Sequence, residues 1–150
     1  MNIFILDSDP EIAAQMLMDK HVVKMALETA QILSTINGGP YRATHERHPC
    51  VLWAKEAIDN YNWLVKHGVG ICNEYRYRYG KEHKSEEIIF CLQEPVSNIE
   101  IPKGSTPHVQ CMPDQYKSID PVKAYQEYYK SKASFANWSK RGIPKWWDLK

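Results

Sequence analysis

Residues 9–40, DPEIAAQMLMDKHVVKMALETAQILSTINGGP, decide the fold. Asp9 can cap a helix and Pro10 suits its first turn, so we expect a long helix to begin here. The NGGP segment at 37–40 predicts that this helix ends near Ile36. Apolar residues recur at helical spacing and form one broad face: Ile12, Met16, Val23, Ala26, Leu27, Ala30 and Leu33.

The rest of the chain also has a helical pattern. A second long apolar stripe follows Pro49 and ends near Gly80, and residues 121–138 predict a C-terminal helix. The apolar run at 3–6 predicts one minor strand, and the Pro-rich, aperiodic segment 94–119 predicts a long loop. We therefore expect a mainly α protein. It would be a single compact helical domain, residues 1–150, with two long helices, a C-terminal helix, the Pro-rich loop and the minor N-terminal strand.

The charges of the chain nearly cancel but are unevenly distributed. The 150 residues contain 19 Lys and Arg and 18 Asp and Glu, for a net charge of +1. This balance argues against a protein that coats nucleic acid by bulk charge, and against an acidic disordered tail. Residues 1–19 sum to −4, 20–84 to +4, 85–116 to −4 and 117–150 to +5. The basic blocks therefore favour a local phosphate site on a balanced surface, although solvated helix faces give the same pattern.

Cysteine usage and hydropathy indicate the compartment. No signal-peptide pattern and no membrane-length apolar run is present, so we expect an intracellular protein without a membrane partner. The four cysteines form no CxxC motif, which is typical of reduced thiols: Cys50, Cys72, Cys91 and Cys111.

A cofactor or metal is not expected from the sequence. His45, His48 and Cys50 are ligand types at close spacing, but no second half with ligand spacing follows them.

Candidate catalytic residues gather around the segment 19–24, DKHVVK. Lys, His and Glu on one helix flank can bind phosphate and exchange protons. A histidine before Pro49 lies at a helix entrance, where backbone amides favour anions. We predict the catalytic residues to be Asp19, His21, Glu28, His48 and His83. Structural roles remain open for these residues. Asp19 would then be a core acid, the Lys, His and Glu flank a solvated helix face, and His48 a helix-capping or packing histidine.

Candidate binding residues come from three further stretches. Residues 74–84, EYRYRYGKEHK, interleave rings and bases as nucleic-acid binders do, and the loop at 108–114 can place polar groups over a cleft. An amphipathic surface helix explains the 74–84 pattern equally well. We predict that substrate is bound by Lys20, Lys24, Arg78, Lys81, Lys84, His108, Gln110 and Tyr129.

Several motifs together resemble a widespread family of small tailed-phage proteins, which implies a location in the host cytoplasm. They are DKHVVKM at 19–25, NYNWL at 60–64, EYRYRYGKEHKS at 74–85, QCMPDQYK at 110–117 and PKWW at 144–147.

The stretch AQMLM at 14–18 resembles the phage pyrimidine-dimer DNA glycosylases, which are small helical proteins. This resemblance implies an N-terminal amine as nucleophile, exposed by removal of the initiator Met, and a glutamate on the first helix. Here Asn2 follows Met1 and is larger than the residues that favour removal. Val23 stands at the position of the glutamate, so Asp19 or Glu28 would have to replace it.

Four functional hypotheses follow. The first is a metal-independent phosphodiester-cleaving enzyme that acts on nucleic acid or on a nucleotide, including a second messenger of host defence. The second is a non-catalytic protein that sequesters a nucleotide. The third is a pyrimidine-dimer-type DNA glycosylase and abasic-site lyase, and the fourth is a structural or host-interaction protein. The oligomeric state is open, a homo-oligomer included. The first two require Asp19, Lys20, His21, His48 and His108 to converge on one cleft.

Overall fold

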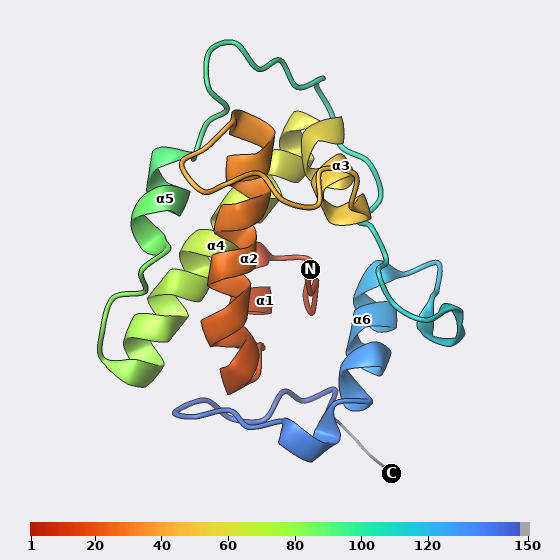
Figure 1. Cartoon of the computed structure of the whole chain (residues 1–150). Helices are drawn as coiled ribbons and strands as arrows, with labels where there is room; N and C mark the ends of the chain where they lie inside the picture. Colours follow the sequence, from red (N-terminus) through yellow and green to blue (C-terminus); the bar gives the residue numbers. More distant parts are fainter. Residues whose placement is uncertain (148–150) are drawn as a thin grey trace.

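Helix α4 lies at the centre of the fold and packs against four other helices (Figure 1). The computed structural model describes residues 1–147, and helices dominate them, which confirms the mainly α prediction. The helices are α1 (Pro10–Gln15), α2 (Asp19–Asn37), α3 (Pro49–Glu56), α4 (Ile58–Tyr79), α5 (Glu86–Cys91) and α6 (Pro121–Lys130). Short 3-10 turns lie at Asp114–Tyr116 and Ala133–Phe135.

Each of the two predicted long helices is broken once. The first break separates α1 from α2, because backbone groups there bond to the C-terminal part of the chain. The Met18 amide donates to the Tyr129 hydroxyl (2.9 Å), and the Trp138 ring N–H donates to the Met16 carbonyl (2.8 Å). The second break is at Ala57, whose backbone is extended, and the next amide donates to the Pro102 carbonyl (2.7 Å). Backbone groups at both breaks therefore have partners that helical periodicity does not reveal.

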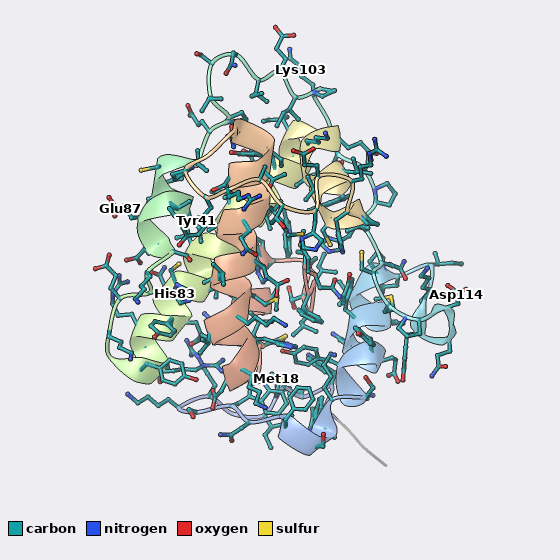
Figure 2. All side chains as sticks on the ribbon, viewed as in Figure 1. Met18, Tyr41, His83, Glu87, Lys103 and Asp114 are labelled. Atoms are coloured by element: carbon teal, nitrogen blue, oxygen red, sulfur yellow. The ribbon has the colours of Figure 1, made fainter. Side chains whose placement is uncertain are left out.

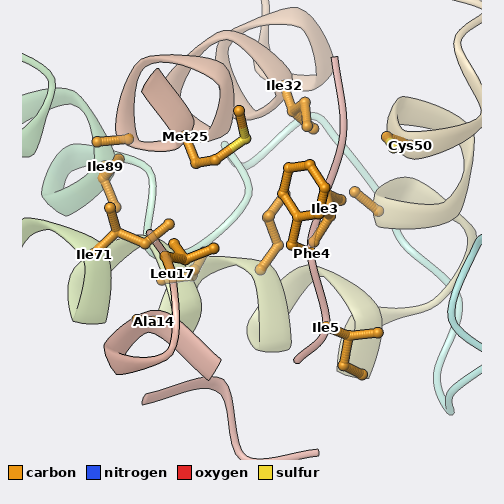
Figure 3. Close-up of a cluster of buried hydrophobic side chains, with 14 of the residues drawn as sticks. Ile3, Phe4, Ile5, Ala14, Leu17, Met25, Ile32, Cys50, Ile71 and Ile89 are labelled. Atoms are coloured by element: carbon orange, nitrogen blue, oxygen red, sulfur yellow. The ribbon is translucent and has the colours of Figure 1, made fainter. Parts of the chain in front are cut away.

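Residues 3–6 are buried in the core but form no strand, and no strand occurs among residues 1–147. Figure 3 shows Ile3 and Phe4 near Ile32 and Cys50, with Ile5 farther along the same segment. Side chains take the place of a partner strand: His108 bonds the Ile3 carbonyl and Gln126 bonds the Leu6 carbonyl, both at 3.1 Å. The expectation of an N-terminal strand is therefore corrected to a buried extended segment.

The Pro-rich loop that follows α5 is irregular as predicted, and it is tied to the start of α4. The Asp59 amide donates to the Gly104 carbonyl (3.0 Å), and Asn60 bonds both the backbone and the hydroxyl of Thr106. The C-terminal helix is α6, which is shorter than the predicted 121–138. Within residues 1–147, no helix is both long and apolar enough to cross a bilayer.

Asp19 joins the α1–α2 break to α4 and to the C-terminal segment. Its carboxylate accepts bonds from Arg78 (2.9 Å), from the Asn137 amide group (3.0 Å) and from both the amide and hydroxyl of Ser139 (2.9 and 2.6 Å). Arg78 is fully buried and also bonds the Gln15 carbonyl. Burial raises the pKa of Asp19, but the bonds from Ser139 and the ion pair with Arg78 outweigh it. The pKa therefore lies below its usual value of 3.8.

The fold predicts that Gly68→Ala destabilises the protein. A Cβ at this position would lie 2.7 Å from the Thr29 Cγ2 of α2 and 3.3 Å from Ile89 of α5. We expect the free energy of unfolding in urea to fall by about 1–2 kcal/mol, because overpacking outweighs the better helix propensity of alanine. Gly142→Ala is the control, since its Cβ would meet nothing within 4 Å. Equal stability of the two variants would contradict the close packing of α2, α4 and α5.

The fold also predicts that Asp19→Asn is destabilising at neutral pH. A carboxyl with a lowered pKa stabilises the fold above its unfolded pKa, and this contribution is lost as the pH falls through the folded value. We expect a loss of about 1–3 kcal/mol at pH 7, which shrinks as the pH drops below roughly 4. Asp114→Asn is the control, because that side chain is 95% exposed. A loss that did not change with pH would refute this role of the carboxylate.

Candidate functional site

The start of the chain lies against a buried glutamate of α2. Figure 1 shows the N-terminus between α2 and α6. Glu28 is 6% exposed, and its Oε1 accepts the Asn2 backbone N–H at 2.9 Å. The Met1 ammonium is 3.5 Å from the same oxygen. A buried carboxylate needs such partners, because burial without them would be costly.

Asn2 anchors the start of the chain to the Pro-rich loop and to α6. Its side-chain Nδ2 donates to the Cys111 carbonyl at 2.8 Å, and its Oδ1 accepts the Tyr125 hydroxyl at 2.7 Å. The same hydroxyl accepts the Cys111 amide at 3.0 Å. Tyr125 is fully buried, and this burial raises its pKa. These bonds fix the position of the first two residues relative to Glu28.

The rim of this site contains a lysine and a histidine. Lys24, whose side chain is 68% exposed, places its Nζ 3.8 Å from Glu28 Oε2. His48 caps α3 by accepting the Cys50 amide at 3.0 Å. Burial, followed by the positive charge of the N-terminal amine, lowers the pKa of His48. An amine, a carboxylate, an imidazole and a cation therefore lie together, and this set can perform nucleophilic and proton-transfer chemistry.

Of the predicted site residues, the structure brings together Glu28, Lys24 and His48. Of the two acids that could replace the glutamate of the glycosylases, Glu28 contacts the chain start, whereas Asp19 bonds Arg78 and the C-terminal segment. Sequence reasoning did not single out Asn2 or Tyr125 as parts of the site. Their side chains meet across 123 residues, a separation that no local pattern signals.

The predicted residues His21 and Tyr129 lie in the interior. His21 stacks on Phe4 with ring centroids 4.5 Å apart, and its Nδ1 is 2.7 Å from the Tyr129 hydroxyl. Burial lowers the pKa of His21 to about 3, and burial raises the pKa of Tyr129. His21 is therefore neutral at physiological pH and contacts core residues rather than solvent.

The other predicted residues hold connections between elements or face solvent. His83 bonds the Val23 carbonyl (2.9 Å), and Gln110 bonds both backbone groups of Ser118 (2.7 and 3.0 Å). Burial lowers the pKa of His108 to about 4. The exposed lysines are Lys20, which lies over the Phe135 ring, Lys81 and Lys84.

These positions correct one expectation. The phosphodiesterase and nucleotide-binder hypotheses require the predicted residues to converge on one cleft. They do not converge, because separate sets of hydrogen-bond partners hold Asp19, His21, His48 and His108. Their burial and internal bonds suit structural roles for Asp19, His21 and His108.

Comparison with known proteins agrees with the geometry of the chain start. A family model described as pyrimidine dimer DNA glycosylase matches residues 1–87, more than half of the chain, including Glu28 and helices α1 to α5 up to Glu87. Searches of curated proteins and of solved structures found no match. On the family match and its extent, this chain belongs to the pyrimidine dimer DNA glycosylase family.

Proposed function

We propose that this protein is a DNA glycosylase with a linked lyase activity at abasic sites. The N-terminal amine is the nucleophile, and Glu28 moves the protons. The observation that carries this proposal is the approach of both candidate amine nitrogens to one buried carboxylate oxygen. The nitrogen of Met1 is 3.5 Å from Glu28 Oε1, and the nitrogen of Asn2 is 2.9 Å from it. The geometry therefore supports amine chemistry whether or not the initiator Met is removed.

The reaction needs one amine and one proton acceptor. The neutral amine attacks C1′ of the nucleotide, and the glycosidic bond breaks with its electron pair leaving on the base. Opening of the C1′–O4′ bond gives a protonated imine between the amine and C1′. Loss of a C2′ proton then expels the 3′-phosphate oxygen and cuts the strand. Glu28 is the carboxylate within reach of the amine proton, and we assign three successive transfers to it. It accepts a proton from the attacking amine, returns that proton to O4′ as the sugar ring opens, and then accepts the C2′ proton. The departing base takes its proton from solvent.

Exposed cationic side chains on α2 and on the segment that follows it support DNA as the substrate. Lys20 and Lys24 are exposed on α2, and the connection from α2 to α3 adds exposed Arg42 and Arg47. Such groups neutralise phosphates and position a strand without reading its bases. Exposed cations on one part of the chain are consistent with its near-zero net charge, because the acids lie mainly in other segments.

The first prediction from this proposal concerns Glu28→Gln. On DNA with an abasic site, borohydride reduces the imine and traps a covalent protein–DNA adduct. We expect the substitution to lower the rate of trapping and strand cleavage by about 10²–10⁴-fold, because a neutral amide cannot accept the protons. Glu87→Gln is the matched control, since Glu87 is exposed on α5 (Figure 2).

An extension of the N-terminus distinguishes loss of the reactive amine from loss of the folded structure. An added N-terminal peptide buries or displaces the amine and should abolish trapping while the helical circular dichroism persists. Unchanged trapping in Glu28→Gln, with a normal melting temperature, would exclude the assigned role of this carboxylate.

The next prediction concerns Lys24→Gln and DNA affinity. If Lys24 contacts one phosphate, its removal should weaken binding to any sequence and reduce the slope of log K against log salt by about 0.9. Lys66→Gln is the control, because Lys66 is exposed on α4 and lines a hollow with the acids Asp9 and Glu11. Fluorescence anisotropy across salt concentrations measures both slopes. An equal loss in the two variants would place the DNA elsewhere.

A further inference from the structure

We propose that His48, Cys50 and Cys111 form a binding site for a thiophilic divalent cation of the zinc class. One donor atom from each residue lies within 4.8 Å of the other two. The two sulfurs are 3.6 Å apart. The proposal rests on these three side chains and not on the proposed glycosylase activity, in which His48 is assigned no step.

The spacing of the sulfurs suits one shared cation. With Zn–S bonds of about 2.3 Å, two thiolates on a tetrahedral zinc lie roughly 3.8 Å apart. The observed 3.6 Å is close to this value. Thiolates and imidazole select zinc-like cations, whereas magnesium and calcium prefer oxygen ligands. The donor set therefore favours a soft or borderline cation.

Neighbouring residues hold the three ligands in position, and two of the ligands are partly exposed to solvent. Cys50 is fully buried in the first turn of α3, while His48 and Cys111 are partly exposed. Cys111 is held on both sides, by the Tyr125 hydroxyl at its amide and by the Asn2 side chain at its carbonyl. The ligands are therefore held by the surrounding structure, and two of the three residues are partly exposed to solvent.

Binding requires few rearrangements. The His48 Nδ1 already points toward residue 50, whose amide donates to it at 3.0 Å. Coordination through Nδ1 replaces this one hydrogen bond. The two thiols lose their protons to solvent, so two thiolates and a neutral imidazole surround the cation. The negative charge of the thiolates offsets the nearby charges of the N-terminal amine and Lys117, which act on Cys111.

A cation here would link three segments of the chain. It would join the start of α3 to the Pro-rich loop, and through the Asn2–Cys111 bond it would hold the first residues near Glu28. The sequence spacing does not predict this metal site, because the third ligand, Cys111, lies 61 residues after Cys50. We expect the cation to stabilise the arrangement of the chain start.

Cobalt titration of the reduced full-length protein tests this site. We expect one equivalent of Co(II) to bind with a thiolate-to-cobalt charge-transfer band and the visible bands of tetrahedral cobalt, and Zn(II) to displace it. Zn(II) should also raise the melting temperature. Cys111→Ser should remove the charge-transfer intensity of one thiolate and weaken binding at least tenfold. Cys91→Ser is the matched control, since Cys91 is an exposed free thiol on α5, and it should bind as the original protein does.

Two outcomes would overturn the proposal. One is the lack of a thiolate charge-transfer band in the reduced protein, and the other is cobalt binding that Cys111→Ser leaves unchanged. X-ray absorption of the zinc-loaded original protein needs no variant and should count two sulfurs and at least one nitrogen around zinc. A shell of oxygen and nitrogen alone would also refute the site. None of these readouts involves DNA, so they can fail while borohydride trapping succeeds, and the reverse.

Discussion

The contact between the Glu28 carboxylate and the first two residues is the constraint on which the site depends. A carboxylate that is 6% exposed needs charged or hydrogen-bonding partners, and here the backbone of Asn2 and the amine of Met1 supply them. The first two residues are held beside α2 by these contacts, and residues 3–6 follow directly into the core. Anchoring of the first two residues at Glu28 therefore also brings the apolar segment that follows them to the core.

The fold was predictable where its signals are local. Asp9 and Asp120 cap helices whose first residue is proline, and Gly80 ends α4 in a left-handed conformation. The breaks were not predictable from periodicity. The residues before α2 deviate from a helix because Tyr129 and Trp138, more than 100 residues away, bond their backbone groups.

The site was only partly predictable for the same reason. The sequence leaves open a core acid at position 19, a role that needs a partner, and the structure provides Arg78. The sequence also makes His21 a catalytic candidate on a helix flank with Lys and Glu, but the ring is buried and stacks on Phe4. Glu28 could be named as a candidate from the sequence, whereas its contact with Asn2 depends on how the chain start crosses α2. The contact between Glu28 and the chain start is therefore a property of the tertiary structure that no local sequence pattern signals.

The central claim is that the reacting nitrogen is the amine of the N-terminal residue. The most direct measurement is tandem mass spectrometry of proteolysed protein after borohydride trapping on abasic-site DNA. The account predicts a deoxyribose remnant on the first residue of the mature chain, either Met1 or Asn2, both of which meet Glu28. A remnant on the side chain of Lys24, or on any other lysine, would contradict it.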